Sequence, residues 1–527
     1  MVAVLSLLIW CAVIDIVSPA KIIGIFPYPG FSHQKVFDPL LKALADRGHD
    51  VTIATFFPNR YHKQNSSEID LRSLSNIKVN DIDMKHLENP SWLLQLPVIG
   101  NVIRQYKNLV DNLSVSSVSI CEKLVLFTPL MEALNKTYDL VIVEQFTSDC
   151  VLGLLEVYGN TAPIIGMSSC SPMPWTRQRL GVEHNPSFVP IITSSLSSQM
   201  SFFERLENTL HNIMMREVYY YKIQLKEQAI IEKQFGRKIS DLHDAANNIT
   251  LLFVNSHYTL NGVRPLVPGL VEVGGIHMNA SEKKTIPEYI EKFTNNSHNG
   301  VILLSFGSRL KLDTLSKTKQ DTLIRVFSRL KQRVIWKYEG ASETGTLVGE
   351  NILQVKWLPQ YELLHHTNVL TIICHGGYLG MTEAISAGKP MVIIPMYGDQ
   401  GSNAASAKEV GVAEVLSLQD LNENNLMKAL ETVLGPEKQE QARLISQIWR
   451  DRANTPLDTA VYWTERVIRW GHRSPLHSTA RNLSLYQYAL LDIALFVIGL
   501  VTSIIVVILS LCRLQKVINN RKIIKLE

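Results

Sequence analysis

Cysteine is scarce in this sequence, and its spacing argues against two classes of protein. The 527 residues contain 6 cysteines and no Cys-x-x-Cys pair, so a structural zinc site is not expected. Two of the six lie in apolar runs at the chain ends, which leaves Cys121, Cys150, Cys170 and Cys374. Four cysteines in a chain of this length do not make a disulfide framework, so we expect ordinary hydrophobic cores to hold the fold together.

Net charge is also nearly absent, which excludes a broadly basic nucleic-acid-binding protein. Lys and Arg number 52 against 48 Asp and Glu, and the formal charge is +4. The excess lies in the tail over 513–527, whose basic residues face a single acid, Glu527. Apolar residues make up 46% of the chain, which suits globular cores, and the length suggests two or three domains.

Two apolar runs mark the ends of the chain. Residues 493–512 carry no charge and are long enough for a helix to cross a bilayer core of ~30 Å, so we predict a transmembrane helix over 491–512. Residues 1–20 have the pattern of a secretory signal peptide, with an uncleaved anchor as the alternative. The positive-inside rule then places residues 21–490 in the lumen and the basic tail in the cytosol.

The body between these runs alternates strands and helices twice over. KIIGIF (21–26) and HDVTIATF (49–56) have the pattern of buried strands around a helix over 36–47, and this βαβ unit predicts a parallel sheet. The alternation starts again at GVILLSFGS (300–308). We predict an N-terminal domain over 21–277, a linker over 278–299, a second domain over 300–455, and helices with a juxtamembrane segment over 456–490. Two such α/β domains predict a ligand cleft between them.

One strand–turn–helix segment in the second domain has the composition of an anion site. His375 ends an apolar strand, Gly376 and Gly377 follow, and Gly380 opens a helix. Free N–H groups and the positive dipole end of such a helix attract a diphosphate. Glu383, one turn further on, can accept hydrogen bonds from sugar hydroxyls. An ordinary glycine turn is the alternative for this pattern alone.

The residues around this segment make the pattern more specific. Trp357 and Gln360 precede it by about one β/α unit, and Asp399 and Gln400 follow the next strand. The stretch 357–400, with SFGS at 305–308, resembles the signature of the UDP-glycosyltransferases, the family that includes the UDP-glucuronosyltransferases. Weaker similarity covers nearly the whole chain, and in detail it is most like arthropod members.

The resemblance implies a GT-B fold, with a UDP-sugar donor in the C-terminal domain and the acceptor in the N-terminal domain. The diphosphate would meet Ser308, His375 and the amides at Gly376, Gly377 and Gly380. Trp357 would stack on uracil with help from Gln360, Glu383 would hold ribose, and Asp399 and Gln400 would hold the sugar. Leu379 departs from the pattern, because mammalian relatives carry Asn there. The UDP-sugar is a co-substrate, and neither a cofactor nor a metal is expected.

The resemblance also assigns a general base, since the family's base lies in the turn that here holds Ser32 and His33. A histidine poised near pH 7 can remove a proton from an acceptor hydroxyl, and its imidazolium then needs a carboxylate partner. Glu144 matches the position of the family's Asp, and Asp149 lies five residues on. We favour Asp149, because a shorter side chain holds an imidazole more rigidly.

Together these residues predict an inverting transferase that moves a hexose from a UDP-sugar to a hydroxyl of a small lipophilic acceptor. Residues from 90–130 and 170–220 would line the acceptor site. The arthropod-like character favours UDP-glucose, with UDP-glucuronate as the alternative donor. An alternative of another class is a membrane-anchored UDP-sugar or lipophile binding protein without turnover. Asp81 and Asp83 form the D-x-D pair that binds metal in another glycosyltransferase fold, but they lie far from the donor signature.

The terminal segments predict the location of the protein. We expect a single-pass protein of the endoplasmic reticulum membrane, with Lys525 as part of a partial dilysine retrieval signal and a homo-oligomer as a possible assembly. Seven Asn-x-Ser/Thr acceptors fit a lumenal body: Asn65, Asn112, Asn135, Asn248, Asn279, Asn295 and Asn482.

Overall fold

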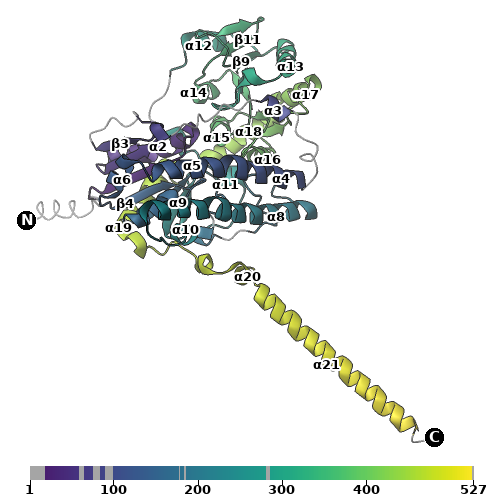
Figure 1. Cartoon of the computed structure of the whole chain (residues 1–527). Coiled ribbons are helices and arrows are strands. Elements are labelled where there is room, and N and C mark those ends of the chain that lie inside the picture. Colours follow the sequence, from purple (N-terminus) through teal and green to yellow (C-terminus); the bar gives the residue numbers. More distant parts are fainter. Residues whose placement is uncertain are drawn as a thin grey trace, which may run out of the picture. The chain divides into compact units, whose positions relative to one another are not determined.

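The structure is a computed structural model that describes residues 18–58, 65–74, 84–88, 99–176, 178–182, 185–279 and 285–524. Most of the predicted signal segment lies outside the described residues, as do Asp81 and Asp83. The described chain divides into a body that ends at His477 and a C-terminal unit that begins at Ser478. The body has two lobes, each built around one sheet (Figure 1).

The first lobe contains a seven-stranded parallel sheet in the order β3-β2-β1-β4-β5-β6-β7. Its strands are β1 (Lys21–Phe26), β2 (Asp50–Thr55), β3 (Ser66–Asp70), β4 (Leu140–Glu144), β5 (Ile164–Ser168), β6 (Ile249–Val254) and β7 (Leu270–Glu272). In β1, Ile23 and Ile25 belong to one core cluster, whereas Ile22 and Phe26 belong to another. Both faces of the sheet are therefore covered, which explains why its strands are apolar almost throughout.

Helices surround this sheet and supply one edge of the cleft. They are α2 (Phe31–Asp46), α4 (Ile99–Lys107), α5 (Val115–Leu124), α6 (Thr128–Leu134), α7 (Cys150–Val157), α8 (Phe202–Tyr219), α9 (Leu225–Phe235), α10 (Leu242–Ala246) and α11 (Tyr258–Asn261). Helix α2 begins five residues earlier than the apolar spacing predicts, because the Gly30 carbonyl accepts the N–H groups of His33 and Gln34 at 3.0 and 3.1 Å. His33 therefore lies in the first turn of a helix and not in a loop.

The second lobe repeats the plan with a sheet in the order β10-β11-β9-β8-β12-β13-β14. Its strands are β8 (Val301–Ser305), β9 (Arg333–Lys337), β10 (Thr346–Val348), β11 (Ile352–Val355), β12 (Val369–Cys374), β13 (Met391–Ile393) and β14 (Ala413–Val415). All neighbours are parallel except β10 and β11. Its helices are α12 (Glu288–Asn295), α13 (Lys317–Ser328), α14 (Gln360–Leu364), α15 (Tyr378–Ser386), α16 (Gln400–Glu409), α17 (Glu423–Leu434) and α18 (Pro436–Arg450).

The described part of the predicted linker over 278–299 is not wholly a linker. Residues 288–295 form α12, and its Ile290 is buried in the core of the second lobe with Tyr289 and Phe293 packed nearby. The polar composition of the segment hid this short apolar face. Helix α12 therefore belongs to the second lobe, and the chain passes between the lobes before it.

The chain passes between the two lobes a second time after α18. Helix α19 (Pro456–Trp470) returns to the first lobe, where Ala460, Val461 and Val467 join the core cluster beside α2. The two passages are tied together, because Arg452 Nη1 donates to the Gly274 carbonyl at 2.8 Å. Short helix α3 (Lys85–Glu88) also reaches the second lobe (Figure 1), where Glu88 Oε1 accepts the Ser316 N–H at 2.7 Å.

A disulfide joins α5 to α7 through Cys121 and Cys150, which are 29 residues apart in the chain. Spacing alone does not pair these two among the four candidate cysteines. Cys170 and Cys374 remain free and buried. The first lobe thus carries one cross-link in addition to its hydrophobic cores.

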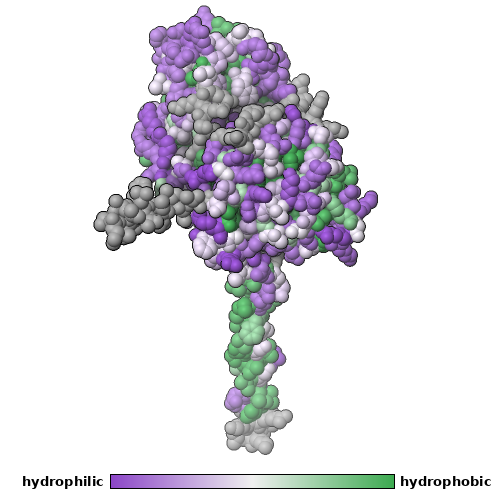
Figure 2. All heavy atoms as spheres, turned by 90° about the vertical axis from the view of Figure 1, so that its left-hand side faces the viewer, coloured by the Kyte–Doolittle hydropathy of each residue, from purple (hydrophilic) through white to green (hydrophobic). Residues whose placement is uncertain are grey.

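The C-terminal unit consists of α20 (Leu485–Tyr488) and the long helix α21 (Leu491–Ile524). Within residues 491–520 of α21, an 18-residue window has a mean hydropathy of 2.9, and this window is not buried against the protein. Figure 2 shows the surface of this helix as mostly hydrophobic. Helix α21 is long and apolar enough to cross a membrane, and it runs past the predicted end at 512 into the basic tail.

Candidate active site

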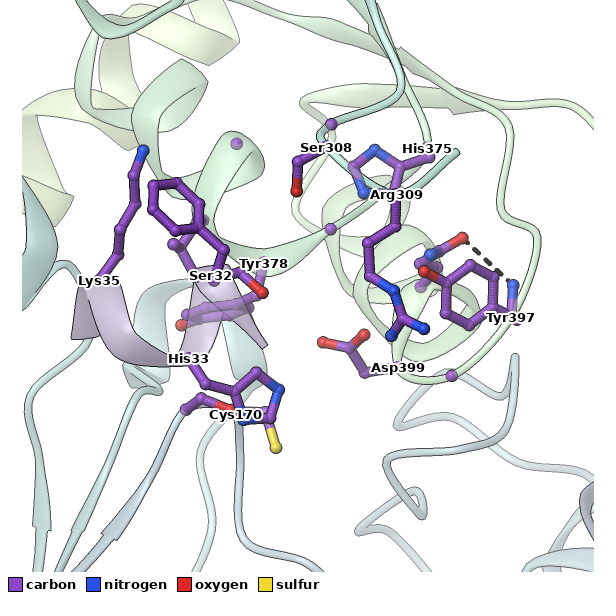
Figure 3. A pocket seen from close by; sticks show the side chains of 18 of the residues that line it. Ser32, His33, Lys35, Cys170, Ser308, Arg309, His375, Tyr378, Tyr397 and Asp399 are labelled. Carbon is purple, nitrogen blue, oxygen red and sulfur yellow. Dashed lines mark hydrogen bonds between the residues drawn. The ribbon is translucent and has the colours of Figure 1, made fainter. Parts of the chain in front are cut away.

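A cleft of about 2090 Å³ lies between the two lobes of the body. The carboxyl ends of parallel strands and the amino ends of helices line it, which is where ligands bind in open α/β sheets. Ser32, His33 and Cys170 come from the first lobe, and Ser308 and His375 come from the second (Figure 3). The cleft therefore brings together the two predicted groups of site residues, which are far apart in the sequence.

His33 forms a short hydrogen bond with Glu144 at the floor of the cleft. The distance from His33 Nδ1 to Glu144 Oε1 is 2.7 Å, and Glu144 is 5% exposed at the end of β4. Burial raises the pKa of Glu144, the bond from His33 lowers it, and the net shift is upward. With Nδ1 bonded to the carboxylate, Nε2 of His33 is the ring nitrogen that can accept a proton from a ligand.

Two aromatic rings fix the plane of the His33 imidazole. The ring centroid of Tyr28 lies 4.5 Å from that of His33, and the centroid of Phe146 lies 4.6 Å away with an edge-on geometry. Such contacts restrict rotation of the ring and cover much of it, so that the His33 side chain is 15% exposed. Together with Glu144 they hold His33 in one orientation.

The preference for Asp149 as the partner of His33 is wrong. Asp149 is completely buried and points to a separate cluster, where its Oδ2 accepts from Arg179 Nη2 at 2.6 Å, Tyr219 Oη at 2.9 Å and Gln224 Nε2 at 2.9 Å. Glu227 accepts the Asp149 N–H at 2.9 Å. Burial raises the pKa of Glu227 to about 8, which favours its uncharged form near neutral pH. The charge of Asp149 is then matched by that of Arg179, with no second carboxylate charge beside the pair.

The glycine-rich turn between β12 and α15 needs glycine for two geometric reasons. Gly376 has φ +83°, in the left-handed region, and a Cβ on Gly377 would lie 2.4 Å from His375 Nε2. The backbone thus wraps closely around the His375 ring at the amino end of α15. Burial lowers the pKa of His375 to about 4, so at neutral pH the ring is uncharged and can donate a single N–H.

Glu383 is held in place at the side of the cleft. Its Oε2 accepts from Gln360 Nε2 at 2.7 Å, and its Oε1 lies 3.6 Å from His277 Nε2. A Cβ on Gly380 would lie 2.9 Å from Gln360 Nε2, so glycine there lets the amide reach Glu383. Burial raises the pKa of Glu383, but His277 and Gln360 offset this and the net shift is downward, which favours the carboxylate.

The other predicted donor contacts also line the cleft. Trp357 is 51% exposed, and Lys337 Nζ lies 5.9 Å from its ring centroid. Asp399 accepts from Asn403 Nδ2 at 2.8 Å, and burial raises its pKa. Gln400 uses its carbonyl inside the protein, where it accepts the N–H groups of residues 396 and 397 at 2.8 and 3.2 Å. Only the side-chain NH₂ group of Gln400 is thus left for a ligand.

Sequence reasoning missed Arg309, which lines the cleft near Asp399 and Tyr397 (Figure 3). Its Nη1 donates to Tyr28 Oη at a long 3.4 Å, and its Nε has no hydrogen-bond partner among the described residues. Tyr397, also missed, faces the same space and has its pKa raised to about 12 by burial. A basic residue directly after SFGS was the available signal for Arg309.

The two lobes define the chain as a GT-B protein. It superimposes on the crystal structure of the kitacinnamycin glycotransferase with a TM-score of 0.52, covering 85% of this chain and 99% of that one at 17% identity. The calicheamicin glycosyltransferase gives a TM-score of 0.53, with 86% and 99% covered at 14% identity. These likenesses confirm the predicted fold class.

The chain belongs to the family described as UDP-glucoronosyl and UDP-glucosyl transferase, whose model matches residues 25–525. It is 34% identical to UDP-glucosyltransferase 2 of Dactylopius coccus, over 94% of this chain and 93% of the relative. It is 28% identical to UDP-glucuronosyltransferase 2B15 of Homo sapiens, over 92% and 91%. The family confirms the prediction of a UDP-glycosyltransferase enzyme that uses a UDP-sugar donor.

Proposed function

We propose that this enzyme transfers glucose from UDP-glucose to a hydroxyl of a small lipophilic acceptor, with inversion at the anomeric carbon. The observation that carries the proposal is the His33–Glu144 pair, whose Nδ1 and Oε1 atoms are 2.7 Å apart. The pair and the residues Ser308 and His375 come from opposite walls of the same cleft. A base on one wall and an anion site on the other suit attack from the face opposite the leaving group.

In this mechanism the acceptor oxygen attacks the anomeric carbon while its proton passes to His33 Nε2. The bond from that carbon to the β-phosphate oxygen breaks, and UDP leaves with the electron pair. Glu144 keeps His33 in the required tautomer and stabilises the imidazolium that forms. The N–H of neutral His375, the Ser308 hydroxyl and the amides at Gly376, Gly377 and Gly380 would stabilise the charge on the leaving diphosphate.

The rest of the donor would occupy the second lobe. Trp357, half exposed at the cleft edge, offers a face for uracil with Gln360 beside it, and Glu383 offers a carboxylate for ribose hydroxyls. Asp399 and the amide of Gln400 would hold the sugar. Leu379 packs partly into the core of the first lobe and contributes no polar group, so amides rather than a side chain serve the phosphate at that position.

The acceptor would bind against the first lobe, where both apolar and polar side chains from the predicted acceptor regions line the cleft. The apolar ones include Leu113, Val115, Met173 and Ile192, and the polar ones include Arg104, Lys107, Asn108 and Asp111. The apolar part of this lining suits the ring or alkyl body of a phenol or lipophilic alcohol. A helix that anchors the enzyme in a membrane would place it beside substrates that partition into lipid.

A second donor, UDP-glucuronate, is favoured by one observation. Arg309 brings a guanidinium into the sugar region of the cleft, and a carboxylate at C6 could pair with it. The 34% identical Dactylopius coccus protein, named a glucosyltransferase, and the 28% identical human glucuronosyltransferase support the two donors in that order.

A donor screen with a phenol acceptor tests the choice. We expect the full-length enzyme to turn over UDP-glucose faster than UDP-glucuronate, measured as glycoside formed per enzyme, because Arg309 also faces Asp399. A preference for UDP-glucuronate that is lost in Arg309→Met would contradict the glucose proposal and assign Arg309 to the carboxylate. The absence of product from either donor would contradict the proposed reaction itself.

We further propose that the body lies in the lumen of the endoplasmic reticulum, with the tail over 513–527 in the cytosol. The Cys121–Cys150 disulfide supports this, because disulfides persist in oxidising compartments. Lumenal residues should carry N-glycans at some of the seven acceptors, and digestion with endoglycosidase H should increase the mobility of the protein on gels. Unchanged mobility would contradict the orientation. A homo-oligomer stays a prediction.

A further inference from the structure

Helix α8 is built with its polar face inward and its apolar face outward. The residues it buries are mostly polar: Glu207, Asn208, His211, Asn212, Met215 and Tyr219. Apart from Glu217, its exposed residues are apolar and between 40 and 66% exposed, and we call these the α8 stripe: Phe202, Phe203, Leu206, Leu210 and Ile213. A surface helix of a soluble domain normally has the opposite arrangement.

Hydrogen bonds on the buried side fix this orientation. Asn208 Oδ1 accepts the Ile191 N–H at 2.8 Å, and its Nδ2 donates to the carbonyls of Pro186 and Val189 at 2.7 and 2.9 Å. His211 Nε2 lies 3.2 Å from the Thr193 hydroxyl. Rotation of the helix to bury the α8 stripe would break these bonds and leave buried polar groups unpaired, which is costly. The outward apolar face is therefore a property of the folded state.

The α8 stripe is a continuous surface. From Phe202 or Phe203 onward, each next member is three or four residues further along, so the stripe follows one side of the helix over about 17 Å. A complete capping box between Ser201 and Glu204 begins the helix, which keeps the two phenylalanines at its start in place. Helix α8 lies next to α4 in the first lobe (Figure 1).

We propose that the α8 stripe inserts into the lipid surface of the same membrane that α21 crosses. Only residues 478–490 connect the body to α21, and thirteen residues reach at most about 45 Å, so the body stays close to the bilayer. Confinement of this kind makes even a weak second contact effective. Helices with an apolar face rich in Phe and Leu lie in this way at the boundary of the acyl chains.

The charges on α8 indicate that the contact is apolar and does not depend on anionic lipid. Arg205 and Arg216 are matched by the acids Glu204 and Glu217, so the helix presents no cationic excess to headgroups. The contact should therefore form on phosphatidylcholine alone and persist at high salt.

Fluorescence quenching in nanodiscs tests the proposal on the full-length chain. Leu210→Cys, made with Cys512→Ser, carries an environment-sensitive fluorophore, and the parent Cys512→Ser alone gives the background from the buried cysteines. The matched control is Leu444→Cys on α18, since Leu210 and Leu444 are both 47% exposed. The wild-type chain labelled at Cys512 in α21 reports the bilayer itself. Retained transferase activity shows that each labelled protein is folded.

We expect fluorescence at position 210 to fall in discs of phosphatidylcholine with brominated acyl chains, relative to ordinary phosphatidylcholine, and to stay constant at position 444. Quenching at 512 with none at 210 would overturn the proposal. Absence of quenching at both 210 and 512 would overturn it too, by removing the anchor on which it rests. A signal at 210 that changes with protein density but not with bromine would assign the α8 stripe to a second copy of the chain instead.

Discussion

Replacement of His33 by alanine should lower the rate of glycosyl transfer by about 10²–10⁴-fold, because the acceptor hydroxyl then loses its general base. Binding of UDP should be unaffected, since His33 belongs to the first lobe and the proposed diphosphate contacts to the second. The measurements are product formation at saturating substrates and calorimetric titration with UDP.

Two variants sharpen this result. Unlike His33→Ala, Trp357→Ala should weaken UDP binding in the same titration, because a stacked ring contributes about 1–3 kcal/mol to binding a base. His472→Ala, at an exposed residue that does not line the cleft, controls for the loss of a histidine elsewhere. Unchanged transfer by His33→Ala would remove it as the base. A wild-type chain that binds UDP but transfers no sugar would instead identify a binding protein without turnover.

Replacement of Asp149 by alanine should lower the free energy of unfolding by about 3–5 kcal/mol, because Arg179 would keep a buried and uncompensated charge. We expect the folded fraction of this variant to retain the turnover of the wild type, since His33 is paired with Glu144. Chemical denaturation measures the stability, and active-site titration gives the turnover of each folded molecule.

The control for Asp149 is an exposed ion pair. Asp321 lies 3.1 Å from Lys317 Nζ on the surface of α13, and Asp321→Ala should cost only about 0.3–0.5 kcal/mol. An Asp149 variant of normal stability but with turnover reduced as far as in His33→Ala would restore Asp149 to the catalytic pair and contradict the present assignment.

Local patterns in the sequence were enough to predict the two sheets and the donor segment. Apolar runs such as 21–26 and 369–374, bounded by turn residues, are typical of buried strands in a parallel sheet. After His375, Gly376 is required by its left-handed backbone and Gly377 by the nearby imidazole ring. Strands with weaker patterns were missed. β3 is polar except for Ile69 and lies at the sheet edge, and β14 has three residues, so neither has a readable periodicity.

The partner of His33 could not be decided locally. Glu144 and Asp149 both follow the apolar part of β4, and side-chain length alone favoured the wrong one. The deciding interactions come from distant parts of the chain, since Arg179 and Tyr219 bind Asp149 from 30 and 70 residues away. Arg309 was missed for the same reason, because its position in the cleft involves a contact with Tyr28 from the opposite lobe.

The two passages of the chain between the lobes have a mechanical consequence. Because Arg452 in the second passage is hydrogen-bonded to Gly274 at the first, the lobes are connected by two linked chain segments and not by one flexible segment. We expect the cleft to open by rotation about this linked pair of segments, with little sliding or twisting. On such a path the hydrogen bond from the Ser316 N–H to Glu88 would have to break, with the neighbouring bonds of Met84 and Leu87, for the lobes to separate at α3.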